Sequence, residues 1–180
     1  MRAKWLWVTV LAALGAGCGE GRAIFVVDVY SFIKGSGADT SAYFILPASD
    51  SASSTPRRID LPGAGSSIVD SATVNGRVNF ENDSGSGSIG LQMYLAADSV
   101  GTYDASALAF TVPQVAVSGA ATVPDTILGR LDSAVLSLLA GAEMWVRFRA
   151  QGTNSGLTLV QGSAVLKSLV LTVAVNDKLF

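Results

Sequence analysis

The chain has 180 residues, 49% of them hydrophobic and only 14% charged, which is enough for one folded domain and excludes a disordered chain. Its formal net charge of −2 excludes nucleic acid as a partner, because a weakly acidic body does not attract phosphate groups. The sequence has no His and a single Cys, which excludes His- or Cys-based catalysis, an intramolecular disulfide and zinc, copper, haem or iron–sulfur sites, so no metal or cofactor is expected.

The first eighteen residues have the pattern of an export signal. Arg2 and Lys4 give it a positive start, residues 5–14 are apolar, and small residues at 15–17 lead to Cys18. The apolar stretch is too short to span a bilayer, which takes about 20 residues. One interpretation is ordinary secretion, with cleavage after position 15 or 17 and a free thiol at Cys18.

Small residues directly before a cysteine resemble the lipobox of bacterial lipoproteins, in which the cysteine sulfur receives a diacylglyceryl group and becomes the mature N-terminus. Gly15 stands where the usual box has Leu, and Leu14 lies one position earlier. The resemblance covers residues 1–18 only and implies that a lipid anchor on Cys18 holds the protein to the membrane. Because Gly19 rather than Asp follows the cysteine, the resemblance also implies sorting to the outer membrane. It divides the chain into a signal peptide (1–17), a lipidated tether (18–22) and a single domain (23–180).

The domain begins with alternating apolar and polar residues, which is the period of a strand with one buried face. This pattern predicts three strands separated by polar loops before residue 68. The strands are Ile24–Ile33, Tyr43–Leu46 and Arg57–Leu61. The loops are Gly35–Ser41, Ser49–Pro56 and Gly63–Ser67, of which residues 49–56 are expected to be the most flexible.

The clearest alternation runs from Ser71 to Phe80 and is followed by a second run from Ile89 to Leu95. In the first run Ala72, Val74, Val78 and Phe80 share one face. Residues 81–87 between the two runs are polar and rich in glycine. Two alternating runs around such a connection predict an antiparallel hairpin with one buried face.

A strand is expected at Leu108–Val117, with Pro113 breaking it or placing it at a sheet edge, because proline cannot donate to a ladder. The next segment has a helical period instead. Its apolar residues recur at spacings of three and four: Ile127, Leu128, Leu131, Val135, Leu138 and Leu139. With Asp125 or Thr126 as N-cap and Gly141 as C-cap, the pattern predicts a short buried helix near residues 126–140.

Three further strands are expected at Glu143–Ala150, Leu157–Val160 and Ala164–Val175. About nine strands and one helix predict a mainly antiparallel β-sandwich. A transmembrane barrel is the rival fold, because Phe180 ends the chain as in many outer-membrane barrels, although Asn176 and Lys178 fall out of phase.

Several short motifs match known sites by their letters alone. Residues 85–90 spell GxGxxG, but strands on both sides favour a turn over a nucleotide-binding loop. Ser31–Lys34 spells SxxK, but on the expected strand its two functional side chains face opposite sides. Glu81, Asn82 and Asp83 supply too few ligands for calcium, so a solvated turn is expected there.

Five triplets of the form Asp-Ser/Thr-apolar resemble the O-glycosylation acceptor of some Gram-negative envelope proteins. They begin at Asp50, Asp70, Asp98, Asp125 and Asp132. Asx-turns and helix caps explain the same letters without any sugar.

One face of the strand at 143–150 suggests a binding surface. Met144, Val146 and Phe148 share the face expected to be buried, whereas Trp145, Arg147 and Arg149 share the other. Aromatic and Arg side chains are enriched where proteins bind partners, so these three residues are the candidate interaction surface. An outer face covered by loops is the alternative.

The expected function is that of a non-enzymatic envelope lipoprotein that binds or scaffolds another envelope protein. Two alternatives remain at this stage: a carrier of an apolar ligand in a cavity between the sheets, and a hydrolase that uses paired carboxylates. Carbohydrate binding would need Tyr43, Tyr94, Tyr103 and Trp145 to be exposed together.

Overall fold

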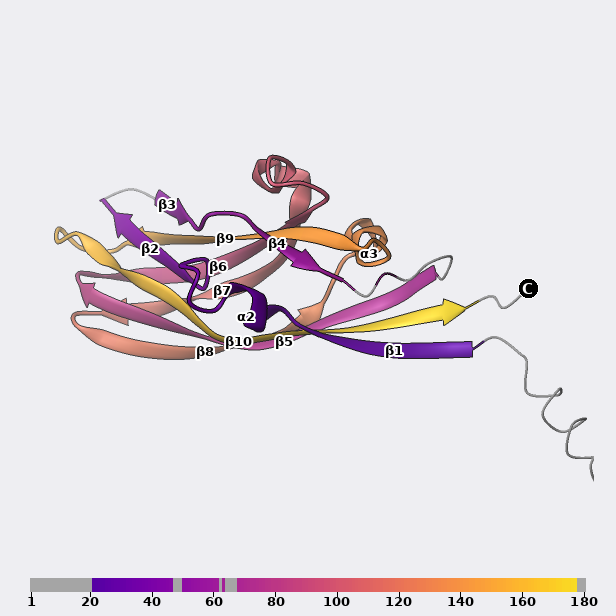
Figure 1. Ribbon diagram of the computed structural model, residues 1–180. Coiled ribbons are helices and arrows are strands. Elements are labelled where there is room, and N and C mark those ends of the chain that lie inside the picture. The colour runs from indigo at the N-terminus through magenta and orange to yellow at the C-terminus, as the bar shows by residue number, and fades with distance from the viewer. Residues whose placement is uncertain (1–20, 47–49, 62, 64–67, 178–180) are drawn as a thin grey trace, which may run out of the picture.

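The computed structural model describes residues 21–46, 50–61, 63 and 68–177. These residues form two antiparallel five-stranded sheets that lie face to face (Figure 1). The β5 sheet has the order β1 (Gly21–Asp28), β10 (Val160–Asp177), β5 (Ile68–Ser84) and β8 (Ala121–Arg130), with β2 (Thr40–Ile45) also paired to β10. The β9 sheet has the order β3 (Asp50–Ser53), β9 (Glu143–Asn154), β6 (Ser86–Ala96) and β7 (Leu108–Ser118), with β4 (Arg57–Asp60) also paired to β9. The predicted β-sandwich is confirmed.

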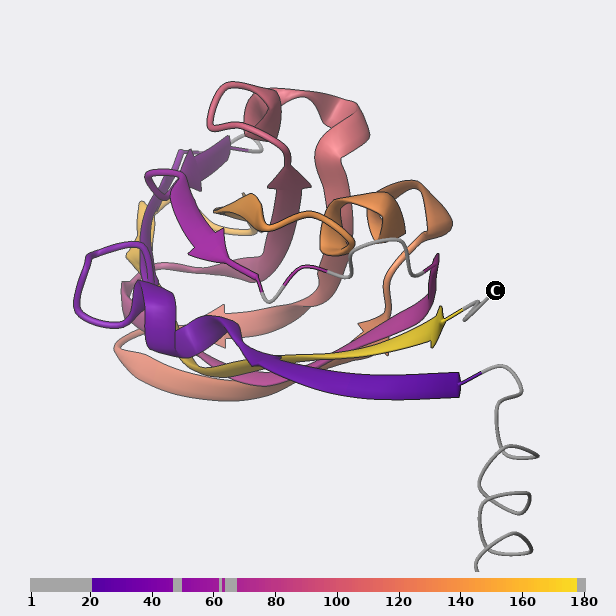
Figure 2. The ribbon, with the colours of Figure 1, turned by 45° about the vertical axis from the view of Figure 1, so that its right-hand side comes forward.

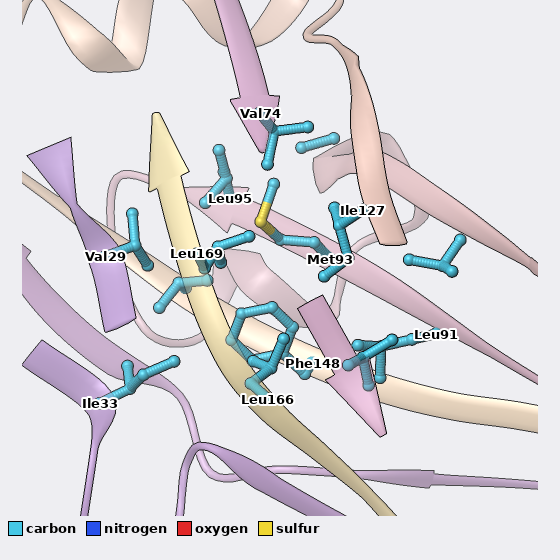
Figure 3. Packing of buried hydrophobic residues seen from close by; sticks show 14 of the residues in the cluster. Val29, Ile33, Val74, Leu91, Met93, Leu95, Ile127, Phe148, Leu166 and Leu169 are labelled. Atoms are coloured by element: carbon cyan, nitrogen blue, oxygen red, sulfur yellow. The ribbon is translucent and has the colours of Figure 1, made fainter. Parts of the chain in front are cut away.

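The core lies between the inner faces of the two sheets. On β5 the alternation predicted from the sequence is confirmed, since Ala72, Val74, Val78 and Phe80 are all fully buried. Phe148 of β9 meets Leu166 and Leu169 of β10 from the other side (Figure 3), and these residues belong to one continuous cluster. Side chains therefore fill the space between the sheets.

The predicted hairpin of β5 and β6 is wrong. β5 pairs with β10 and β8, whereas β6 pairs with β7 and β9, so the chain passes from one sheet to the other at Gly85. Gly85 has a φ of 77°, in the left-handed region that glycine adopts without strain. The polar residues expected to form a turn belong to β5 as far as Ser84, because that strand keeps pairing with β10 and β8.

The strand predicted at Ile24–Ile33 ends at Asp28 and gives way to the short helix α2 (Val29–Ile33). A carboxylate oxygen of Asp28 accepts a hydrogen bond from the Ser31 N–H at 3.3 Å and caps the helix. Ser31 and Lys34 therefore lie on a helical turn rather than on a strand, which corrects the reason for rejecting SxxK. The Ser31 hydroxyl donates its hydrogen bond to the Asp28 carbonyl at 2.7 Å, so it is not directed at the Lys34 amine.

The predicted helix at 126–140 is half right. α3 spans only Ser133–Leu139, and Asp132 caps it by accepting from the Ala134 N–H, in place of Asp125 or Thr126. Ile127 and Leu128 lie on β8 instead, where Ile127 is buried and Leu128 is 71% exposed. The spacing of 127, 128 and 131 fits either a helix or an edge strand, and the ladder to β5 decides for the strand.

Other segments differ less from the expectation. Residues 50–53 of the predicted flexible loop form β3, which is paired to β9. Leu157 lies outside any strand and is 97% exposed, and β10 is one long strand rather than two. Pro113 lies on the edge strand β7, where it and Gln114 face the single residue Gly90 of β6, so its placement at an edge is confirmed.

Tyr43 of β2 is fully buried, and its hydroxyl donates to the Asn82 side-chain oxygen at 3.2 Å. Burial raises the pKa of this phenol from 10.0 to about 12, and the charges of Asp83 and Glu81 add to the rise. The fold therefore holds the neutral phenol, whereas the unfolded chain releases the proton from about pH 10 upward.

We expect the free energy of unfolding to fall as pH rises from about 10 to about 12, with the Tyr43 contribution fully present below pH 10. The loss attributable to this group should reach roughly 2 kcal/mol near pH 12. Urea denaturation of the protein and of Tyr43→Phe at each pH measures it. Tyr43→Phe should be less stable than the parent below pH 10, but its free energy of unfolding should fall less between pH 10 and 12. An equal fall in both proteins would show that Tyr43 is not the group responsible.

Candidate functional site

The outer face of the β9 sheet carries the connection between β6 and β7, residues 97–107. It contains two short 3-10 helices, η1 (Gly101–Tyr103) and η2 (Ala105–Ala107). Figure 2 shows this connection, which we call the outer loop, rising from the β9 sheet on the side away from the β5 sheet. Ala107 of the outer loop packs with Tyr94 and Ala96 of β6 in a small apolar cluster separate from the main core.

Arg147 of β9 fastens the outer loop to the sheet. Its Nε and Nη2 both donate to the Thr102 carbonyl, at 2.9 and 2.7 Å, and its Nη1 donates to the Ser53 hydroxyl at 2.7 Å. The guanidinium carbon lies 4.2 Å from the ring centroid of Tyr94 and 4.6 Å from that of Tyr103. The residue is only 3% exposed, so two aromatic faces and a carbonyl replace the water around its charge.

Hydrogen bonds within the outer loop fix its shape on either side of Thr102. The Thr102 hydroxyl donates to the Ser99 carbonyl at 2.7 Å, and the Gly101 N–H donates to the Asp98 carboxylate at 2.7 Å. Thr102 is fully buried. The neighbouring Tyr103 and Val100 are therefore held in place although they are 61% and 76% exposed.

A depression of about 420 Å³ lies where the outer loop meets the sheet. It is lined by Thr55, Pro56, Ser99, Val100, Tyr103 and Trp145. Trp145 is half-buried on β9, two residues before Arg147 and on the same face of the strand. Tyr103 and Trp145 thus bring two aromatic side chains to the lining of one depression, with one hydroxyl-bearing residue from the outer loop and one from the segment before β4.

A charged cluster lies on the same sheet face beside the depression. Arg58 of β4 is the cross-strand neighbour of Trp145, and its guanidinium contacts Asp60 at 3.2 Å and Glu143 at 3.3 Å. All three side chains are at least half exposed. The two carboxylates face one guanidinium on an open surface rather than each other across a cleft, which is the arrangement of a surface ion-pair network and not of a glycosidase site.

The structure places the predicted surface residues in different surroundings. Trp145 lines the depression, whereas Arg147 is buried beneath the outer loop and supports the depression from below. Arg149 is half-buried, is not part of the lining, and has an interaction of its own. Trp145, Arg147 and Arg149 share one face of β9, as the alternation predicts, but only Trp145 lines the depression, so not all three can contact a ligand there.

Carbohydrate binding by the four aromatic residues would need all of them exposed together, and the four do not meet this condition. Tyr43 and Tyr94 are buried, whereas Tyr103 and Trp145 share the depression. Sequence reasoning missed Val100 and the outer loop as a unit, because the segment has no periodic pattern. The only signals available were an aromatic residue and an Asp-Ser turn motif.

The remaining motifs have structural explanations where the structure describes them. Asp98 and Asp132 accept hydrogen bonds from backbone N–H groups three and two residues later, as the turn and cap interpretation predicts, whereas Asp125 lies within β8 and accepts from the Thr126 N–H at 2.7 Å. Glu81 binds Lys167 at 3.2 Å on the surface whereas Asn82 points inward, so these neighbours do not converge. Within the described residues, no group of three or more His, Cys, Asp or Glu could hold a metal.

Two further expectations from the sequence were an apolar cavity between the sheets and attachment to a membrane. The surface hollows that the described residues line include one of 310 Å³ and one of 600 Å³, and they open to solvent, while the inner faces of the sheets are packed. Neither helix of the described chain is long and apolar enough to cross a bilayer. Cys18 and Phe180 lie outside the described residues.

No family model matches the sequence, and no curated protein matches it. Solved structures resemble it in shape. The chain is similar to a structure of the infectious bursal disease virus Gx strain, with 13% identity, a TM-score of 0.46, and coverage of 89% of this chain and 33% of that one. It is similar to the VP2 subviral particle of the same virus, with 10% identity, a TM-score of 0.44, and coverage of 86% and 40%.

A third similar structure is TmCBM61 in complex with β-1,4-galactotriose, with 10% identity, a TM-score of 0.29, and coverage of 86% of this chain and 88% of that one. The chain spans about a third of the length of the first viral chain. At these identities and TM-scores the likenesses carry no argument about what this chain binds.

Proposed function

We propose that this protein is a non-enzymatic binding module, held at the bacterial outer membrane by a lipid on Cys18, that binds an envelope component through the depression between Tyr103 and Trp145. One observation carries the proposal: a buried Arg147 holds the outer loop so that exposed side chains stay fixed beside Trp145. Fixing a surface before binding lowers the entropy that the ligand must overcome.

The cost of this arrangement supports a binding role. Burying a guanidinium is unfavourable unless it is well paired, and among the described residues Arg147 has no ion pair with a carboxylate, so its hydrogen bonds to the outer loop and Ser53 must offset the loss of water. The depression lies on the outer face of the β9 sheet. β1, at whose start the proposed tether would join, belongs to the β5 sheet on the other side of the sandwich (Figure 1). A tethered domain would thus keep the depression accessible.

The anchor is tested by the mass of the mature protein. We expect the N-terminus to start at Cys18 with a diacylglyceryl group attached, and Cys18→Ser to move the protein from the membrane fraction to the soluble fraction, because acyl chains supply the membrane affinity. Intact-mass spectrometry and fractionation measure both. An uncut leader with no added mass would refute the anchor.

The binding face is tested by cross-linking in native membranes. A benzophenone amino acid at position 100, on the rim of the depression, should give a discrete adduct, because it inserts into C–H bonds of proteins and sugars alike. The matched control places it at exposed Asn75, on the outer face of the β5 sheet. Adducts that are absent at 100, or equal at 100 and 75, would contradict a binding role for this face.

A further inference from the structure

We infer that the depression binds a neutral oligosaccharide, with a sugar ring stacked on Tyr103 and Trp145. The inference rests on the proposed function, since it names the ligand class of the same depression. Three features of the described residues lead to it: fixed aromatic faces, a mixed polar rim, and the absence of an available cation near the rings.

The aromatic faces are rigid and open. Arg147 lies against one face of the Tyr103 ring at 4.6 Å, and because the side chain is 61% exposed, the other face is turned to solvent. Trp145 stands on a sheet strand in the same lining. Sugars bind through the apolar C–H face of the ring, which suits a flat aromatic surface that is already immobile.

The rim supplies polar partners of both kinds. Thr55 and Ser99 bring hydroxyl groups to the lining, and the cluster of Arg58, Asp60 and Glu143 adds donors and acceptors next to Trp145. A sugar hydroxyl both donates and accepts, so it can use such a mixed rim, whereas an alkyl chain would leave these groups without partners.

Charge argues for a neutral ligand. The charge of Arg58 is shared by two carboxylates, Arg147 is buried under the outer loop, and Arg149 has an interaction of its own. Asp98 and Asp104 of the outer loop are exposed. With Arg57 next to the lining residue Pro56, the four arginines and four carboxylates of this region balance, so an anionic polysaccharide or a nucleic acid meets no excess of positive charge beside the rings.

Size argues for a sugar over a protein partner. A volume of about 420 Å³ falls within the range of small-ligand clefts, roughly 300–1,000 Å³. A stable protein interface buries about 800 Å² on each partner, far more than two rings, Val100 and Pro56 can offer. A protein partner is the main alternative to a sugar, and a protein adduct in the cross-linking experiment would indicate it.

The test is oligosaccharide binding to the purified mature protein in a detergent that contains no sugar. Trp5 and Trp7 lie in residues 1–17, so after cleavage Trp145 is the only tryptophan and its fluorescence reports on the site. The probes are gluco-, galacto-, manno- and N-acetylglucosamine oligomers of three to six units, with polygalacturonate as the anionic counterpart. We expect at least one neutral series to change the fluorescence and to bind with a Kd of about 10 µM to 10 mM by calorimetry, and polygalacturonate not to bind.

Variants separate stacking from general effects. Tyr103→Ala should weaken binding at least about tenfold, the loss of one stacked ring, while Tyr103→Phe should stay within about threefold. Phe44→Ala is the matched control, because Phe44 is 60% exposed on the other sheet. Thr55→Lys brings a long side chain into the depression without altering a residue of the outer loop, and it should also weaken binding about tenfold or more.

The inference fails if no neutral oligomer binds more tightly than about 10 mM, if polygalacturonate binds equally, or if Phe44→Ala weakens binding as much as Tyr103→Ala. A protein adduct at position 100 without sugar binding would overturn the ligand class and leave the binding face intact. No adduct and no sugar binding would overturn both.

Discussion

Replacing Arg147 with Met is expected to lower the free energy of unfolding by about 3 kcal/mol and to weaken ligand binding at the depression. Met has a similar length but makes none of the three hydrogen bonds from the guanidinium to Thr102 and Ser53. The Thr102 carbonyl would then be buried without its hydrogen-bond donor. The contacts of the guanidinium with the rings of Tyr94 and Tyr103 would also be lost. Relief of the buried charge offsets part of this loss.

The chain offers a matched control for this change on the same sheet face. Arg58→Met removes another arginine from the same sheet face, but Arg58 is 54% exposed and makes surface ion pairs. The substitution should therefore lower the free energy of unfolding by less than about 1 kcal/mol. Urea denaturation measures both. Hydrogen exchange at residues 99–104 should rise in Arg147→Met alone, and equal losses of stability in the two variants would show that Arg147 does not fasten the outer loop.

Arg147→Lys distinguishes geometry from charge. An ammonium group keeps the positive charge but cannot donate from two fixed nitrogens to one carbonyl while stacking between two rings. We therefore expect it to recover less than half of the lost stability.

The alternation of residues was sufficient to predict which faces of β5 and β9 turn toward the core between the sheets. Each inward residue on those strands contributes its own burial energy, so the signal is local and repeats every two residues. The pairing of strands, in contrast, depends on segments that are far apart in the sequence. A polar connection rich in glycine looks the same whether the flanking strands pair or part, and at Gly85 they part because β10 and β9 pair with them instead.

The two errors about helices have a common physical origin. Apolar residues at 127, 128 and 131, or alternating from 24 to 33, fit more than one backbone conformation over a short stretch. The caps decide: Asp28 and Asp132 each accept from a backbone N–H and begin a helix at the next residue. Asp132 and Asp125 are each followed by a hydroxyl-bearing and then an apolar residue, yet only Asp132 begins a helix, so these letters alone do not identify the cap.

The site could be predicted only in part for the same reason. Trp145 and Arg147 follow from the phase of β9, but the burial of Arg147 depends on a loop more than forty residues earlier in the chain. The outer loop has no period because tertiary hydrogen bonds, rather than a repeated face, determine its shape.

Replacing Asn82 with Ala should have the largest effect of any polar substitution in the sandwich, about 4 kcal/mol. The side-chain nitrogen donates to the carbonyls of Ser84, Gly85 and Gly119, at 3.0, 3.3 and 2.6 Å, and the side-chain oxygen accepts from Tyr43. Because Asn82 is 3% exposed, water cannot replace these bonds easily. One amide thus joins the crossing at Gly85 to the connection between β7 and β8.

Asn75→Ala is the control, since Asn75 lies on the same strand with its side chain on the solvent-facing side, and it should change stability by less than about 0.5 kcal/mol. Asn82→Asp keeps the shape and tests the charge: an ionised carboxylate would face three carbonyl oxygens, so this variant should be less stable than Asn82→Ala near neutral pH. Both follow from urea denaturation. If Asn82→Asp folded as stably as the parent, the amide nitrogen could not be the group that holds the two sheet crossings together, and the turn at Gly85 would have to be stabilised by its backbone alone.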